Sequence, residues 1–146
     1  MNSGKMANGK RISGVVFSDL GQGAAFMTLE WVQQILRERL GFTPYAGTLN
    51  LRLSSDKEVT LWTDLRRSIK GVDIPPPQPS FCRARCLLAR IEGLPQNGTE
   101  GLEVAVLVPE VDHYPDNKIE VIAPFHIKES LHIDDGDRLT LQFIGD

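Results

Sequence analysis

Residues 41–53 read Gly-Phe-Thr-Pro-Tyr-Ala-Gly-Thr-Leu-Asn-Leu-Arg-Leu. Side chains alternate between the two faces of a β-strand, so Thr48 and Asn50 are expected on one face and the three neighbouring leucines on the other. The pattern therefore predicts a strand over 48–53 that has one polar face and one apolar face.

A hydroxyl and an amide carbonyl on one strand face could bind the same hard cation. Mg²⁺ prefers oxygen ligands and is usually held by few protein groups together with substrate phosphates. Thr48 and Asn50 carry no charge, so such a site needs phosphates to supply it. The two residues alone leave another interpretation open, in which Thr48 is an ordinary strand residue and Asn50 is a polar residue beside a turn.

The length and composition predict one globular domain. The chain has 146 residues, of which 41% are apolar and 24% charged, as is usual for globular proteins. We expect residues 1–10 to form a flexible tail and 11–146 a single domain. No segment approaches the roughly 18 apolar residues of a membrane-spanning helix, and the N-terminus lacks the hydrophobic core of a signal peptide, so a cytoplasmic protein without membrane contact is expected.

The net charge of −3 argues against a large nucleic-acid surface, which needs clustered Lys and Arg.

Cys82 and Cys86 are four residues apart, with no Cys or His partner at metal-site spacing. We expect both to be free thiols.

Hydrophobic patterning predicts one amphipathic helix among several strands. The helix is expected over Thr28–Leu40, with Gly41 at its C-terminal cap. Glu58–Gly71 is ambiguous between strand and helix. Besides 48–53, strands are expected at Arg11–Phe17, Phe81–Ile91, Leu102–Val108, Lys118–Ile122 and Arg138–Ile144. This mainly β pattern favours a small closed barrel, which leaves no exposed sheet edge.

An Asp-Gly-Asp corner at residues 135–137 precedes the last expected strand. Such corners occur in small barrels of several functions, including DNA-binding ones. A DNA-binding regulator is therefore one hypothesis, although the acidic net charge disfavours it.

Two further segments could contribute to a site. Gly21-Gln22-Gly23 follows a strand, and its backbone N–H groups could approach a phosphate closely. An ordinary hairpin turn is the alternative. Glu120 is expected on the strand face opposite Ile119 and Val121, where it could bind a polyol hydroxyl or act as a base, or could simply be an exposed strand residue.

Three motifs in this order resemble the CTP-dependent riboflavin kinases best known from archaea, over about Ile12 to Gly145. They are Leu20-Gly21-Gln22-Gly23, Leu40-Gly41-Phe42-x-Pro44-Tyr45-x-Gly47-Thr48-Leu49-Asn50 and Ile119-Glu120-Val121-Ile122-Ala123-Pro124. The Pro-Tyr-x-Gly-Thr-Leu-Asn string is the most specific of them.

The resemblance implies a six-stranded cradle-loop barrel that transfers the γ-phosphoryl group of CTP to the 5′-hydroxyl of riboflavin, giving FMN and CDP. It implies Mg²⁺ on Thr48 and Asn50, and flavin contacts from Asp112 and Glu120, with Glu120 as the candidate catalytic residue. A monomer is expected. The implied nucleotide-binding residues are Leu20, Gly21, Gln22, Gly23, Ala24, Ala25, Phe125, His126, Ile127 and Lys128.

The chain departs from the family pattern near the glycine turn. Asp19 stands where a glycine is usual, Gln22 where Glu is common, and Ala24 where a long side chain, often Arg, is common. Losing a cation near the triphosphate would weaken electrostatic stabilisation. A second hypothesis is therefore a catalytically silent barrel that binds a nucleotide or flavin as a sensor. The sequence also leaves the choice between CTP and ATP open.

Overall fold

The computed structural model describes residues 10–18, 27–76, 83–92 and 102–145, and its strands form one antiparallel sheet. The strands are β1 (Arg11–Phe17), β2 (Leu49–Arg52), β3 (Val72–Ile74), β4 (Ala84–Glu92), β5 (Leu102–Pro109), β6 (Lys118–Ile122) and β7 (Arg138–Phe143).

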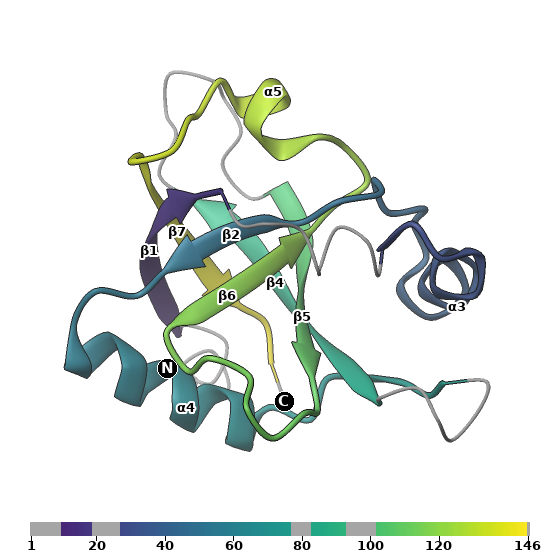
Figure 1. Cartoon of the computed structure of the whole chain (residues 1–146), viewed down its shortest axis with the longest axis horizontal. Helices are drawn as coiled ribbons and strands as arrows, with labels where there is room; N and C mark the ends of the chain where they lie inside the picture. The colour runs from purple at the N-terminus through teal and green to yellow at the C-terminus, as the bar shows by residue number, and fades with distance from the viewer. Residues whose placement is uncertain (1–9, 19–26, 77–82, 93–101, 146) are drawn as a thin grey trace, which may run out of the picture.

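The sheet closes on itself. Its strand order is β3-β4-β5-β6-β2-β1-β7, and β4 also pairs with β7. Six strands therefore form a barrel, while β3 is added outside the ring on β4 (Figure 1). The mainly β class and the six-stranded barrel are confirmed. The short strand β3 was not predicted, because its three residues form a strand only through pairing with β4.

The expected amphipathic helix is present as α3 (Glu30–Leu40) and ends at Gly41, whose φ of 82° is left-handed. The described residues contain two further helices, α4 (Asp56–Ser68) and α5 (Ile127–Leu131). In α4, the Ser55 side chain caps the first turn by accepting a 3.1 Å hydrogen bond from the Glu58 backbone N–H. The ambiguous stretch 58–71 is thus mostly helical. No helix in the described ranges is long and apolar enough to cross a membrane.

Apolar side chains of alternate strand residues fill the barrel interior, and two helices cover its ends. Trp62 of α4 is 1% exposed and lies with its ring centroid 5.6 Å from that of Phe143. Ile127 and Leu131 of α5 join the same apolar cluster. Figure 1 shows α4 and α5 at opposite ends of the barrel.

A second apolar cluster lies outside the barrel, beneath α3. Val32 and Leu36 of this helix are fully buried with Leu107 of β5 and Cys86 of β4. Because both faces of β5 are covered, this strand is apolar almost throughout. Burial raises the pKa of the Cys86 thiol to about 12, and Cys86 is free as expected. Cys82 lies outside the described residues.

The junction between β3 and β4 requires a glycine at position 71. Its φ is 71°, and a Cβ placed on it would lie 2.5 Å from the Cys86 carbonyl oxygen. Gly41 is also left-handed, but nothing lies within 4 Å of a Cβ placed there. Gly41→Ala should cost about 1–2 kcal/mol for its backbone conformation, and Gly71→Ala should cost clearly more. Urea unfolding of both variants measures the difference, and equal losses would contradict the close approach.

Candidate functional site

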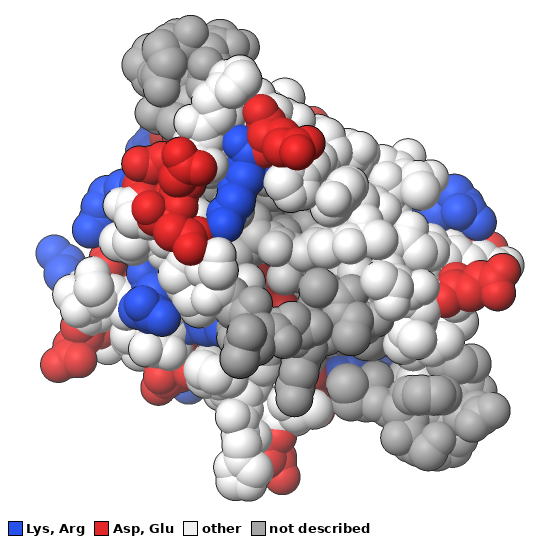
Figure 2. Space-filling view, turned by 45° about the horizontal axis from the view of Figure 1, so that its top comes forward, with Lys and Arg blue, Asp and Glu red and all other residues white. Residues whose placement is uncertain are grey.

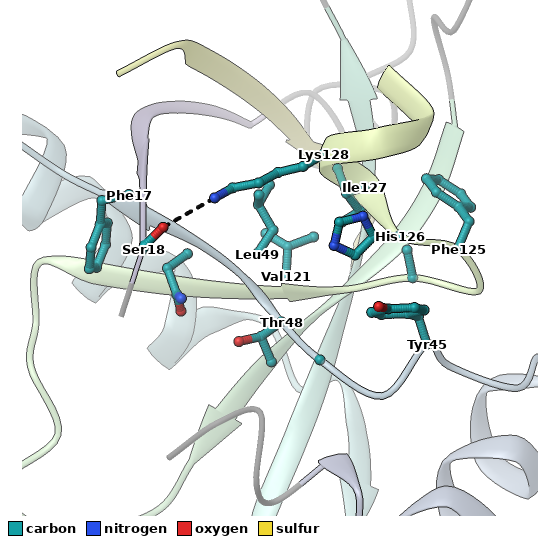
Figure 3. Close-up of a pocket in the computed structure, with 13 residues that line it drawn as sticks. Phe17, Ser18, Tyr45, Thr48, Leu49, Val121, Phe125, His126, Ile127 and Lys128 are labelled. Carbon is teal, nitrogen blue, oxygen red and sulfur yellow. Dashed lines mark hydrogen bonds between the residues drawn. The ribbon is translucent and has the colours of Figure 1, made fainter. Parts of the chain in front are cut away.

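A pocket opens where β1, β2 and β6 meet the segment that leads into α5 (Figure 3). Its volume is about 190 Å³. A single water molecule needs only about 10–15 Å³, so part of a larger ligand can fit. The lining residues are Phe17, Ser18, Tyr45, Gly47, Thr48, Leu49, Asn50, Val121, Ala123, Phe125, His126, Ile127 and Lys128.

The two residues predicted to bind a metal, Thr48 and Asn50, both line this pocket. Leu49 and Leu51 point into the barrel core, as the alternation predicted. Asn50 is 8% exposed. Neither polar side chain forms a hydrogen bond to another described residue. Their oxygen atoms are therefore not engaged by the described part of the fold.

The pairing of β2 with β6 brings Asn50 opposite Glu120. Directly opposed residues of antiparallel strands point to the same face, with Cβ atoms about 4.5–5.5 Å apart. The same register places Phe17 of β1 opposite Asn50 on its other side. A carboxylate and a carboxamide thus lie side by side on the outer face of the barrel.

Glu120 is buried, with only 3% of its surface exposed. Its Oε2 atom accepts a hydrogen bond from the Tyr114 hydroxyl. Its Oε1 atom is buried and has no hydrogen-bond partner among the described residues. The alternative in which Glu120 is an exposed strand residue is wrong. An unpaired buried carboxylate oxygen is costly, and it is a strong acceptor for a ligand that carries a donor.

The segment before α5 forms one wall of the pocket together with the segment before β2. The backbone N–H of Tyr45 donates a 2.7 Å hydrogen bond to the Ala123 carbonyl. The Tyr45 ring meets the His126 ring edge-on, with centroids 4.8 Å apart (Figure 3). His126 in turn caps α5, because its Nδ1 accepts a 3.3 Å hydrogen bond from the Glu129 backbone N–H.

Lys128 reaches across the pocket mouth toward the end of β1 (Figure 3). Its Nζ atom donates to Ser18 Oγ at 3.2 Å and to Asp135 Oδ1 at 2.7 Å. Ser18 also donates to Asp135 Oδ2 at 2.7 Å. These hydrogen bonds, that of Lys128 first, hold the pKa of Asp135 below its usual range. In the upper part of Figure 2, acidic and basic side chains lie next to one another on the surface.

The structure brings together Thr48, Asn50 and the whole of Phe125–Lys128. Asp112 is exposed and does not line this pocket. The predicted nucleotide-binding residues Leu20, Gly21, Gln22, Gly23, Ala24 and Ala25 lie outside the described residues, as does Asp19.

Sequence reasoning missed four residues that the geometry places in or beside the site. Tyr45 belongs to the most specific motif, and Ser18 precedes the glycine turn, so both could have been found. Tyr114 contacts Glu120, and Asp135 contacts Lys128. No local sequence pattern predicts either contact.

The donor set at Thr48 and Asn50 fits a hard cation, because a hydroxyl and a carboxamide carbonyl are both oxygen ligands. In the described ranges, no group of three His, Cys, Asp or Glu side chains could hold a metal ion. A cation at this pocket would therefore need further oxygen ligands from water or from a phosphate.

Comparisons with known proteins show what the chain is similar to. The family model CTP-dep_RFKase, described as "Domain of unknown function DUF120", matches residues 16–143. A riboflavin kinase of Pyrobaculum islandicum is 36% identical over 132 residues, which cover 90% of this chain and 59% of that protein. A riboflavin kinase of Archaeoglobus fulgidus is 34% identical over 135 residues, covering 92% and 54%. The chain thus spans somewhat more than half the length of these relatives.

The ion pair between Lys128 and Asp135 generates a prediction about pH. In Lys128→Met, the pKa of Asp135 should rise toward the ordinary value of about 3.9, because its main hydrogen-bond donor is lost. In the unsubstituted protein, the lowered pKa of Asp135 stabilises the fold at pH values above the ordinary pKa of an aspartate. This stabilisation is lost as the pH falls through the lowered pKa of the folded state. NMR titration of the carboxyl carbon measures both pKa values. An unchanged value would show that Lys128 does not hold this carboxylate.

Proposed function

The chain belongs to the CTP-dependent riboflavin kinase family, and we propose that it transfers the γ-phosphoryl group of CTP to the 5′-hydroxyl of riboflavin. The P–O bond to the β-phosphate breaks, the new bond forms to the hydroxyl oxygen, and the hydroxyl proton is released. The products are FMN and CDP. Such a transfer depends mainly on positioning and charge neutralisation rather than on covalent chemistry.

The observation that carries this proposal is the position of Asn50 opposite Glu120 in the β2–β6 ladder. In the proposal, Asn50 and Thr48 hold the phosphate side of the reaction, and Glu120 holds the hydroxyl side. The two sides must be within a few ångströms for an in-line transfer. Adjacent strand positions on one face provide that separation.

On the phosphate side, Thr48 and Asn50 are the residues that would hold Mg²⁺, which when bound supplies charge neutralisation for the phosphate oxygens. Lys128 lies at the mouth of the same pocket and supplies a further positive charge. We assign the triphosphate to this pocket and include Phe125, His126 and Ile127 in its wall.

On the hydroxyl side, the unpaired Oε1 of Glu120 accepts a hydrogen bond from the ribityl chain of riboflavin. An ionised carboxylate is an acceptor only, so its natural partner is a hydroxyl or an N–H group. We propose that Glu120 orients the 5′-hydroxyl and takes up its proton. Asp112 lies in the loop before β6, on the chain segment that leads to Glu120, and we keep it as a flavin contact.

The preference for CTP is part of the proposal. It rests on the family and on the glycine-turn segment 20–25, whose backbone groups would read the base edge. Incubation of the purified chain with riboflavin, Mg²⁺ and each nucleoside triphosphate in turn should give FMN most rapidly with CTP. Chromatography with flavin fluorescence measures the product. Flavin binding without FMN from any triphosphate would instead favour the sensor hypothesis.

Removal of either proposed metal ligand should slow the reaction. Asn50→Ala and Thr48→Val should each lower kcat at least about 10-fold, by comparison with the usual effect of disturbing a metal site. A matched control is Thr60→Val, which removes the hydroxyl of an exposed threonine on α4 and should leave turnover unchanged. Raising the Mg²⁺ concentration should partly restore the two site variants but not alter the control. Full turnover in Asn50→Ala would remove Asn50 from the metal site.

A further inference from the structure

Tyr114, which donates a hydrogen bond to Glu120, lies outside all three family motifs. Resting on the proposed function, we infer that Tyr114 is a positioning residue that fixes the Glu120 carboxylate so that only Oε1 faces the ligand hydroxyl. Three observations carry this inference: the hydrogen bond itself, the burial of the Glu120 carboxylate and the Lys118 ammonium that lies over the Tyr114 ring.

The hydrogen bond divides the two carboxylate oxygens between protein and ligand. The Tyr114 hydroxyl donates to Oε2, and Oε1 has no hydrogen-bond partner among the described residues. Without the tyrosine hydroxyl, both oxygens would need partners, and the carboxylate could rotate about its last torsion, which has broad minima. The bond therefore selects one orientation of an otherwise adjustable side chain.

Burial makes this selection strong. Glu120 is 3% exposed and Tyr114 is partly buried, so water competes little for the bond. Hydrogen bonds to an ionised group are about twice as strong as neutral ones and strengthen further in a low-dielectric environment. The hydrogen bond from Tyr114 can therefore keep the Glu120 carboxylate in one orientation while a ligand binds to its other oxygen.

The Tyr114 ring lies beside a cation of β6 and within electrostatic range of α4. The Lys118 ammonium lies 5.5 Å from the centroid of the Tyr114 ring. On α4, burial lowers the pKa of Arg66, and the nearby Asp116 and Tyr114 act in the opposite direction. Tyr114 is therefore near Arg66 of α4 as well as bonded to the β6 carboxylate. Its loop is the segment that carries the proposed flavin contact Asp112.

A double-mutant cycle tests the inference, because a residue that acts through Glu120 loses its effect when the carboxylate is absent. The cycle uses the unsubstituted chain, Tyr114→Phe, Glu120→Met and the double variant. Tyr114→Phe should raise the KM and Kd for riboflavin about tenfold and leave the KM for CTP unchanged. In the Glu120→Met background, the same substitution should change riboflavin binding less than twofold.

His113→Ala is the matched control, since His113 is exposed and adjacent in the same loop. It should leave riboflavin binding and turnover unchanged. Melting temperatures of all five proteins establish that each is folded before binding is compared, with flavin fluorescence as the direct binding measurement.

The outcomes separate the inference from the proposed function. If the unsubstituted chain forms FMN but the two substitutions are additive, Tyr114 contributes only packing and the inference is overturned. A loss of CTP affinity equal to the loss of riboflavin affinity would overturn it as well. If the unsubstituted chain neither binds riboflavin nor forms FMN, the proposed function itself fails, and the role of Tyr114 fails with it.

Discussion

The antiparallel pairing of β2 with β6 is the constraint on which the candidate site depends. Leu49 and Leu51 of β2 face the barrel interior together with Ile119 and Val121 of β6. A slip of the register by one residue would expose these side chains and turn the polar residues between them into the core. The apolar core of the barrel therefore fixes the positions of Asn50 and Glu120, although neither belongs to it.

The outer face of the barrel shows why this polar pair is unusual. The register runs from Phe17 through Asn50 and Glu120 to Leu107 and then Cys86. The last two residues of this row are buried beneath α3. Two polar side chains thus lie between apolar neighbours, and one carboxylate oxygen is left unpaired among the described residues. Such an arrangement costs stability, and a buried unsatisfied group of this kind is typical of a functional site.

The sequence predicted those features that depend on local periodicity. The alternation in β2 and the apolar stripe and Gly41 cap of α3 follow from local spacing. The closed barrel follows from the number of expected strands and the need to leave no exposed sheet edge. The α4 segment stayed ambiguous because Val59, Thr60 and Trp62 favour strands, although Ser55 and Glu58 mark a helix start. Strand β3 escaped prediction because its three residues form a strand only through pairing with β4, ten or more residues away.

The same distinction holds for the site. Motifs identified Thr48, Asn50, Glu120 and Phe125–Lys128, and the structure places all of them on one end of the barrel or on the adjoining outer face. The bond from Tyr114 to Glu120 depends on how the loop before β6 folds back, which has no periodic signal. The contact of Asp135 with Lys128 depends on a chain reversal at Gly136, whose φ is 97°.

In the proposed function, the Lys128–Asp135 pair also bears on how the pocket would hold a triphosphate. Asp135 is exposed, and exposed ion pairs contribute little to stability because water screens them. Exchanging this carboxylate for phosphate oxygens would therefore cost little, while Asp135 keeps the lysine extended across the pocket mouth in the meantime. In the proposed function, a local counter-ion of this kind would keep Lys128 available to the pocket of a chain whose net charge is −3.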